Sequence, residues 1–418
     1  MRMVGYRIAA MAVVTATAAT ALALQRTPSP PPRLVAEIPA AAPADLAVQF
    51  EALLGQHSVL ASNMMRSRIR GDDDFVQAAN ASLGRNTEDM TALVGRLFGA
   101  ATADKFEPLW SRHVVALFAY AGALADHDDT ARARARADLT GFEGELAAFF
   151  AAGSQGRLPV ATARELVIQH VQHLTGQADA YAAGDYAGSG QAFRSGFQHT
   201  YDLGLGLAKA LLPPSSTAGL TEPAWQLRSQ LAKLLAEHAV LIEDTTRAAV
   251  TRTPDFAASA RMLNANTSDL AAAMDTLFGP AAARQFQDLW GTHVTALVDY
   301  SAGAAARDAG RQRKARDELN VFHNAMATFL AGATNGRATP AALRAALSEH
   351  DNMLLRHADA YAARNYSSAH DIAYQTYDHM VALAGTLADA FGASVAARLP
   401  RGPAQTGHGG MADVVGHR

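Results

Sequence analysis

The sequence predicts an all-α protein, built as a tandem duplication of a six-helix, bundle-like domain. From Asp45 onward, apolar residues recur at steps of three and four, the spacing that places them on one face of a helix. The composition is Ala-rich and 49% hydrophobic, which favours helices. Most motifs between residues 45 and 213 recur about 180 residues later. No alternating pattern typical of strands competes with this interpretation.

The clearest repeated segment is residues 105–120, KFEPLWSRHVVALFAY, which recurs at residues 285–300 as QFQDLWGTHVTALVDY. Trp110, His113 and Tyr120 lie at helical steps i, i+3 and i+10, so they share one face. A histidine on an apolar helix face, present in both copies, is the feature that most needs an explanation.

Residues 1–24 have the pattern of a secretory signal peptide. Arg2 and Arg7 precede an apolar run, and residues 21–23, Ala-Leu-Ala, supply the small residues of a cleavage site. An uncleaved membrane anchor is the alternative, because the run approaches the length of a thin bilayer span. Either interpretation predicts a protein that is secreted or held in the cell envelope. The absence of cysteine excludes disulfides, thiolate metal ligands and a cysteine nucleophile.

The mature chain is expected to begin with a Pro/Ala-rich linker at residues 25–44, and helices follow. The first helix spans about 45–70. The acidic run at 72–74 starts the second, which ends at the Phe-Gly pair 98–99. The third ends near 125, the fourth spans 129–152, the fifth starts at Pro159, and the sixth ends near 212. The first repeat therefore covers residues 45–213.

A Ser/Thr/Gly/Pro-rich linker at residues 214–224 separates the two repeats. The second repeat covers 225–392, with the same order of helices. Residues 393–418 are Gly- and Pro-rich, and we expect a disordered tail.

Four histidines of the first repeat have a histidine at the matching position of the second, whereas His127 and His173 do not. The four lie on four different predicted helices, mostly among apolar neighbours. The pairs are His57 with His238, His113 with His293, His170 with His350, and His199 with His379.

Residues on facing helices of a bundle converge in its core, so each repeat could bring four imidazoles together. Neutral imidazoles bind zinc and copper, and a carboxylate-poor site disfavours magnesium and calcium. The sequence therefore predicts one copper or zinc site in each repeat. Asn86 and Asn266, with Trp110 and Trp290, are the expected supporting residues around the ligands.

Two other interpretations stay open at this point. A buried histidine is often a packing or pH-sensing residue whose ring nitrogens bond a carbonyl, an amide or a water. Catalysis is the third possibility, but the sequence contains no nucleophile elbow, phosphate-binding loop or dinucleotide fingerprint, and no paired Glu-x-x-His of a di-iron bundle. We therefore favour a non-enzymatic metal-binding protein over an envelope interaction or structural protein.

The charge balance argues against nucleic acid as a partner, because the net charge is −3 and nucleic-acid-binding domains are normally basic. A short basic run recurs in both repeats and is either a solvated helix end or a contact for an anionic envelope component. Its residues are Arg132, Arg134 and Arg136 in the first repeat, and Arg311, Arg313, Lys314 and Arg316 in the second. The two repeats are also expected to pack on each other.

The order of these motifs resembles an uncharacterised secreted helical-repeat domain of Gram-positive bacteria, sometimes found beside modules labelled copper amine oxidase N-terminal-like. The resemblance covers both repeats. It is carried by Gln56-His57, Asn86 to Asp89, His113, Gln169-His170 and His199, and by Glu237-His238, Asn266 to Asp269, His293, Glu349-His350 and His379. It implies a helical fold and an extracytoplasmic location, and it implies no established activity.

Overall fold

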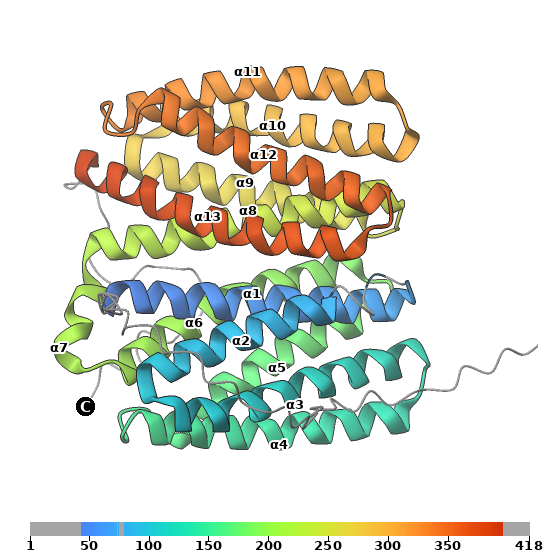
Figure 1. The fold of residues 1–418 in the computed structure, drawn as a ribbon, viewed down its shortest axis with the longest axis vertical. Helices are drawn as coiled ribbons and strands as arrows, with labels where there is room; N and C mark the ends of the chain where they lie inside the picture. Colours follow the sequence, from blue (N-terminus) through green and yellow to red (C-terminus); the bar gives the residue numbers. More distant parts are fainter. Residues whose placement is uncertain (1–42, 73, 75–78, 396–418) are drawn as a thin grey trace, which may run out of the picture. The chain divides into compact units, whose positions relative to one another are not determined.

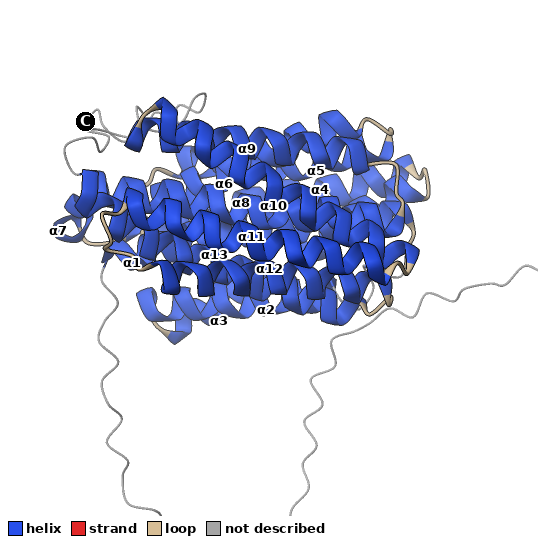
Figure 2. Cartoon of the chain, turned by 90° about the horizontal axis from the view of Figure 1, so that it is seen from above, coloured by secondary structure: helices blue, strands red, loops and turns tan. Residues whose placement is uncertain are grey.

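The computed structural model describes residues 43–72, 74 and 79–395, and the secondary structure within these ranges is helical throughout (Figures 1 and 2). This confirms the predicted all-α fold class. The described residues belong to one compact unit, residues 41–418. The predicted signal peptide, the Pro/Ala-rich linker up to residue 42, and the tail from residue 396 lie outside the described residues.

Six long helices form the first half of the described chain, and several of them begin or end at the glycine and aspartate residues described below. They are α1 (Pro43–Arg70), α2 (Asn80–Phe98), α3 (Ala100–Ala125), α4 (Asp129–Gly153), α5 (Val160–Ala182) and α6 (Tyr186–Leu211). We call them the first helix set. The predicted start of the second helix falls partly on residues outside the described ranges.

Individual glycine and aspartate residues determine where several helices begin and end. Gly99 has a φ of 85°, a conformation that favours glycine, and it joins α2 directly to α3. Asp128 caps α4 and Asp185 caps α6, because each carboxylate accepts a hydrogen bond from a backbone N–H three residues later, at 2.9 and 2.8 Å. These caps satisfy donors that the first helical turn leaves without a partner.

Helix α1 is the centre of the first helix set and packs against α2, α3, α5 and α6. Phe50, Leu54 and Met64 are at most 1% exposed and belong to one continuous core with the apolar faces of the surrounding helices. A helix surrounded in this way buries polar residues as well as apolar ones, and His57 on α1 is fully buried. The site described below is built around this helix.

The second helix set follows the same order. It comprises α8 (Pro223–Thr251), α9 (Phe256–Phe278), α10 (Pro280–Ala306), α11 (Ala309–Ala333), α12 (Pro340–Ala362) and α13 (Tyr366–Val395). Helix α8 takes the central place and contacts α9, α10, α12 and α13. Helix α13 runs three residues into the segment predicted as a tail. That the two sets arose by duplication stays an inference from the sequence.

The segment between the sets is not an extended linker. It forms one short helix, α7 (Pro214–Thr217), and one 3₁₀ turn, η2 (Ala218–Thr221), and Leu220 of this turn is buried. The sets themselves meet through α1 with α8, α6 with α9, and α13 with α2 (Figure 1). The predicted domain boundaries at 213 and 225 therefore stay predictions, since both sets lie in one compact unit.

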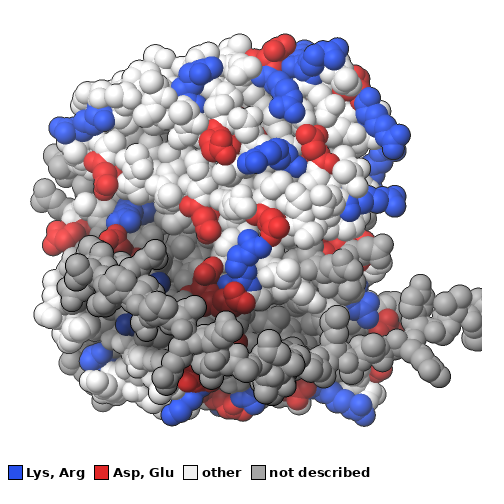
Figure 3. Space-filling model, viewed as in Figure 1, with Lys and Arg blue, Asp and Glu red and all other residues white. Residues whose placement is uncertain are grey.

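On the face shown in Figure 3, basic and acidic residues alternate without a large area of one sign. Within the described ranges, no helix combines the length and the apolar character that a membrane span requires.

Candidate metal centres

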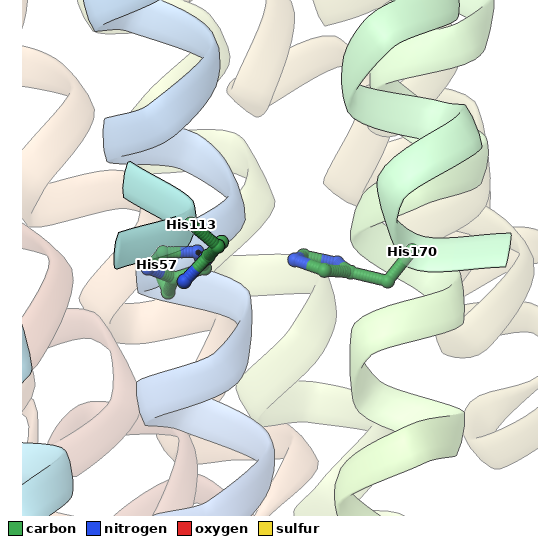
Figure 4. Close-up of side chains that lie close together, drawn as sticks. All are labelled: His57, His113 and His170. Carbon is green, nitrogen blue, oxygen red and sulfur yellow. Dashed lines mark hydrogen bonds between the residues drawn. The ribbon is translucent and has the colours of Figure 1, made fainter. Parts of the chain in front are cut away.

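Three of the four matched histidines in the first helix set meet in its core. His57 comes from α1, His113 from α3 and His170 from α5 (Figure 4). The three side chains are 0, 0 and 3% exposed, and one ring nitrogen of each lies within 4.8 Å of the others. We call this group the first trio. It exists because the central helix and two of its neighbours each place a histidine at the same depth.

Two rings of the first trio touch, and the third stands slightly apart. His113 Nε2 lies 2.9 Å from His57 Nε2, a hydrogen-bonding distance in which one ring donates and the other accepts. The Nδ1 atom of His113 contacts the Trp110 carbonyl oxygen, so it carries a proton and leaves Nε2 as the acceptor. Both ring nitrogens of His170 lack a hydrogen-bond partner among the described residues.

Aromatic rings close the first trio on one side. The Trp110 ring lies 4.7 Å from the His57 ring and 4.6 Å from the His113 ring, between centroids. Phe142 of α4 stacks on His113 at 4.3 Å with an angle of 10° between the planes. These contacts fix the imidazoles and exclude water from that side.

Burial keeps all three imidazoles uncharged at neutral pH. Loss of solvation lowers the pKa of His113 to about 3. It lowers the pKa of His57 and His170 well below the usual value, and the neighbouring histidines lower both further. A neutral imidazole keeps a nitrogen lone pair, so these side chains are in the protonation state that metal binding requires.

The second helix set contains the same arrangement. His238 of α8, His293 of α10 and His350 of α12 form the second trio, and they are 0, 1 and 2% exposed. Their ring centroids lie 5.4 to 6.1 Å apart. Burial lowers the pKa of His350 to about 3 and that of His238 well below its usual value. Trp290 lies 4.7 Å from the His238 ring, as Trp110 does from the His57 ring in the first trio.

One carboxylate distinguishes the second trio from the first. Asp351 Oδ1 lies 3.2 Å from His293 Nε2, and its Oδ2 accepts a hydrogen bond from His323 Nε2 at 2.8 Å. Burial alone would raise the pKa of Asp351, but these two imidazoles outweigh it, so the pKa lies below its usual range. The matching position of the first set is Val171. Sequence reasoning missed Asp351, although the His-Asp pair at 350–351 has no counterpart in the first repeat and could have drawn attention.

The fourth predicted ligand does not join either trio. His199 Nε2 donates to the Leu166 carbonyl oxygen at 2.9 Å, and its ring lies 5.5 Å from that of His173. His379 Nε2 lies 3.3 Å from the Ala346 carbonyl oxygen, and its ring stacks at 6.4 Å from His350. The spacing along α6 and α13 puts these histidines beside the trios rather than among them.

Each of the two predicted supporting asparagines bonds the side chain that precedes a trio histidine, Gln56 before His57 and Glu237 before His238. The Asn86 amide donates to the Leu53 carbonyl at 3.1 Å and to Gln56 Oε1 at 3.1 Å, and the buried Asn86 Oδ1 has no partner among the described residues. Asn266 makes the matching contacts with the Leu234 carbonyl at 3.0 Å and with Glu237 Oε2 at 2.9 Å. His57 Nδ1 also has no partner in the described part of the chain, and the Asn86 side chain raises the pKa of His57 against the effect of burial.

The donor set of each trio fits a transition-metal ion, provided that the rings close slightly. Nitrogens bound at 2.0–2.1 Å in tetrahedral directions lie roughly 3.4 Å from each other. The ring nitrogens of each trio span up to 4.8 Å, so the outermost imidazole must move by about 1.5 Å, of the order of one side-chain adjustment. Three imidazoles in a buried site without competing cationic groups are a donor set of zinc and copper sites.

Comparison with protein-family models, with curated proteins and with solved structures finds no match to this chain. The resemblance described from the sequence therefore stays a prediction. The chemistry of the two trios is the remaining basis for a function.

Proposed function

We propose that the protein is an exported, non-enzymatic binder of transition metal, with one copper or zinc ion held by each histidine trio. The observation that carries this proposal is the burial of six imidazoles in two groups of three, and each group includes ring nitrogens that have no hydrogen-bond partner among the described residues. Burying a polar atom without a partner costs about 1–3 kcal/mol. A bound ion would satisfy those nitrogens and offset that cost.

The choice of copper or zinc follows from the ligands. Imidazole suits both ions, and neither trio offers a thiolate, since the chain contains no cysteine. In general, Cu²⁺ binds a nitrogen site more tightly than Zn²⁺. Three protein ligands leave a fourth position for water or another donor. The near-complete burial of all six rings supports storage or transport of the ion rather than turnover of a substrate.

Metal content tests the proposal directly. Purified protein loaded with copper or zinc and then desalted should contain about two ions per chain, one for each trio. His113→Ala should reduce this to about one, and His113→Ala combined with His293→Ala should abolish it. His127→Asn is the matched control, because His127 is exposed and lies in neither trio. Wild-type protein that retains no copper and no zinc would disprove the proposal.

A second candidate function is supported by the contacts within the trios. The His57–His113 hydrogen bond and the Asp351 contacts can serve as packing in an envelope interaction or structural protein. Thermal melts distinguish the two functions, because a ligand that binds only the folded state raises the melting temperature. Copper or zinc should raise the melting temperature of a metal binder and chelator should lower it, whereas neither should affect a purely structural protein.

The ion pairs that the basic residues form within the chain argue against a contact with an anionic envelope component. Five of the seven cations lie within 4.0 Å of a carboxylate of the same chain. Exposed pairs of this kind contribute little to stability and still lower the charge available to a partner. Binding of the protein to vesicles containing anionic lipid, at low and high salt, would test this contact.

A further inference from the structure

A cleft of about 660 Å³ lies between the two helix sets. Its walls come from α5 and α6 of the first set and from α8 and α9 of the second. Gln169 and His173 of α5 and His199 of α6 line one wall, and Lys233 and Glu237 of α8 line the other. Gln169 and Glu237 directly precede His170 and His238, so the cleft reaches the backbone neighbours of a ligand from each trio.

The first trio is covered on one side and has further imidazoles on the other. Trp110 and Phe142 cover His57 and His113 from the α3–α4 side. His170 points from α5 toward His57 and His113 (Figure 4), and it lies three residues before His173, on the same face of that helix. The titratable groups outside the trio that act on its pKa are His199 and His173. Both of these line the cleft. An ion that approached from solvent through the cleft would therefore meet these two imidazoles before it met His170.

His173 and His199 are placed so that both imidazoles could bind one metal ion. Their ring centroids lie 5.5 Å apart, and His173 is half-buried at the cleft wall. His199 donates its Nε2 proton to the Leu166 carbonyl, which leaves the Nδ1 lone pair free to bind an ion. A hydrogen bond of this kind commonly orients a metal-binding imidazole. Burial lowers the pKa of both histidines, so they are uncharged at neutral pH.

The charges of the cleft suit the passage of a cation. Three carboxylates line it, Glu237, Asp269 and Asp202, against the two cations Arg194 and Lys233. Arg194 binds Glu237 at 2.8 Å and Asp269 at 2.6 Å, which ties the basic group to the wall rather than to the centre of the cleft.

We propose that this cleft is the port through which the metal reaches the first trio, and that His173 and His199 are its transient docking ligands. This inference rests on the proposed metal-binding function. The ion exchanges ligands from the docking pair to His170 and then to His57 and His113. No electron is transferred, and no imidazole proton is released to solvent, because all five rings are already neutral.

The rate of copper uptake tests the port separately from the presence of a site. The background variant is His350→Gln, which disables the second trio so that only the first is followed. This protein also carries Trp225→Phe and Trp290→Phe, so that Trp110 is its single tryptophan. Cu²⁺ alone is mixed with it, and quenching of Trp110 fluorescence reports arrival at the trio, since the Trp110 ring lies 4.7 Å from His57. Copper is the probe because imidazole sites bind it more tightly than zinc.

Two variants interfere with the port without touching the trio. His173→Ala removes a docking ligand, and Ala272→Phe places a bulky ring on an exposed position that lines the cleft. Each should slow uptake about tenfold, the lower end of what a supporting ligand contributes at metal sites, and leave one copper per chain at equilibrium. His127→Asn and Ala92→Phe are the matched controls, since both positions are exposed and neither lines the cleft.

The rate of uptake and the amount of bound copper together distinguish the port from the metal site. Slower uptake with an unchanged end point supports the port. Unchanged rates in both variants overturn the port and leave the metal function standing. Loss of the bound copper itself in a folded His173→Ala protein would make His173 a permanent ligand, which also overturns it. Absence of quenching and of bound copper in the background protein, together with metal-free wild type, overturns both proposals.

Discussion

The free energy of a buried imidazole depends on what its two nitrogens contact. His199 has a carbonyl partner at 2.9 Å, whereas His170 has no partner on either nitrogen among the described residues. The first pattern is that of a satisfied core histidine. The second leaves a cost that only a ligand or a bound water can remove. The two histidines are similar in sequence context, and this difference in contacts marks His170 as the ring that gains more from a bound ion.

Replacing His170 with leucine should change stability in opposite directions with and without metal. His170→Leu keeps the volume and removes two unpartnered nitrogens, so in chelator the free energy of unfolding should rise by about 1–3 kcal/mol. With zinc or copper present, the variant should gain less stability than wild type, because one ligand of the first trio is gone. Urea unfolding in both conditions measures the two values. A destabilised variant in chelator would show that the His170 nitrogens are satisfied in the metal-free protein.

The buried carboxyl of Glu243 should make the free energy of unfolding fall as the pH rises. Burial raises the pKa of its carboxyl from 4.5 to about 8, so the folded state keeps a proton that the unfolded state releases. The contribution of this group is therefore full below pH 4.5 and is lost as the pH rises through about 8. Between the two pKa values, the free energy of unfolding falls by about 1.4 kcal/mol for each pH unit. Glu243→Gln should remove that loss, so that it is more stable than wild type at pH 9 and similar at pH 5. Parallel curves of unfolding free energy against pH for the two proteins would contradict this interpretation.

At the residue scale, sequence periodicity predicted which faces are buried, and it therefore placed His57, His113 and His170 in the core. It also predicted His199 as a fourth ligand, whereas the structure places His199 beside the trio, because one step of helix rotation separates a ligand from a neighbour. It also missed Asp351, since a single aspartate on a helix face has no periodic pattern that distinguishes a buried position from an exposed one.

The scale of whole helices was the most predictable, because helix ends depend on neighbouring residues. Gly99, Asp128 and Asp185 end or start helices through their own conformation or capping oxygen. The segment at 214–221 was less predictable. Its Ser, Thr and Gly residues are typical of linkers, yet the structure folds it into α7 and η2 over the buried Leu220. Tertiary packing outweighed local preference there.

The contact between α1 and α6 depends on a missing side chain. A Cβ atom at Gly204 would lie 2.7 Å from the Cα atom of Glu51, so the two helices can approach only because residue 204 is glycine. Gly204→Ala should lower the free energy of unfolding by about 1–3 kcal/mol through forced separation of the helices. Gly176→Ala is the control, since nothing lies within 4 Å of its Cβ position and alanine is the better helix former. Chemical unfolding should show opposite signs for the two variants.

At the scale of the whole described unit, buried ion pairs join the two helix sets. Arg66 of α1 lies 3.5 Å from Asp244 of α8, and Arg247 binds both Asp244 and Asp255, at 2.7 and 2.6 Å. Tyr181 of α5 donates to Asp255 at 3.0 Å. The contacts that cross between the sets join residues far apart in the sequence, so no local pattern announces them. The sequence predicted that the sets pack together but contained no information about how.

Asp244→Asn should destabilise the whole unit rather than one helix set. The substitution leaves Arg66 and Arg247 buried with less compensating charge, and breaking a buried pair in this way costs about 3–5 kcal/mol. Because the network spans both sets, far-UV circular dichroism should show a single transition at lower denaturant concentration. Asp299→Asn disrupts an exposed pair with Arg311 and should cost less than about 1 kcal/mol. Two separated transitions in Asp244→Asn would show instead that the sets unfold independently.

The carboxylate at position 351 makes the two candidate metal centres electrically unequal. A divalent ion would carry its full +2 into the first trio, where position 171 is valine, and a net +1 into the second, where Asp351 contacts His293. An interior of low polarity penalises the larger charge. The first centre should then require an anion as the fourth ligand of a divalent ion, whereas Asp351 already supplies a negative charge to the second. The two halves of the chain would in this way differ in their need for an anion from solution.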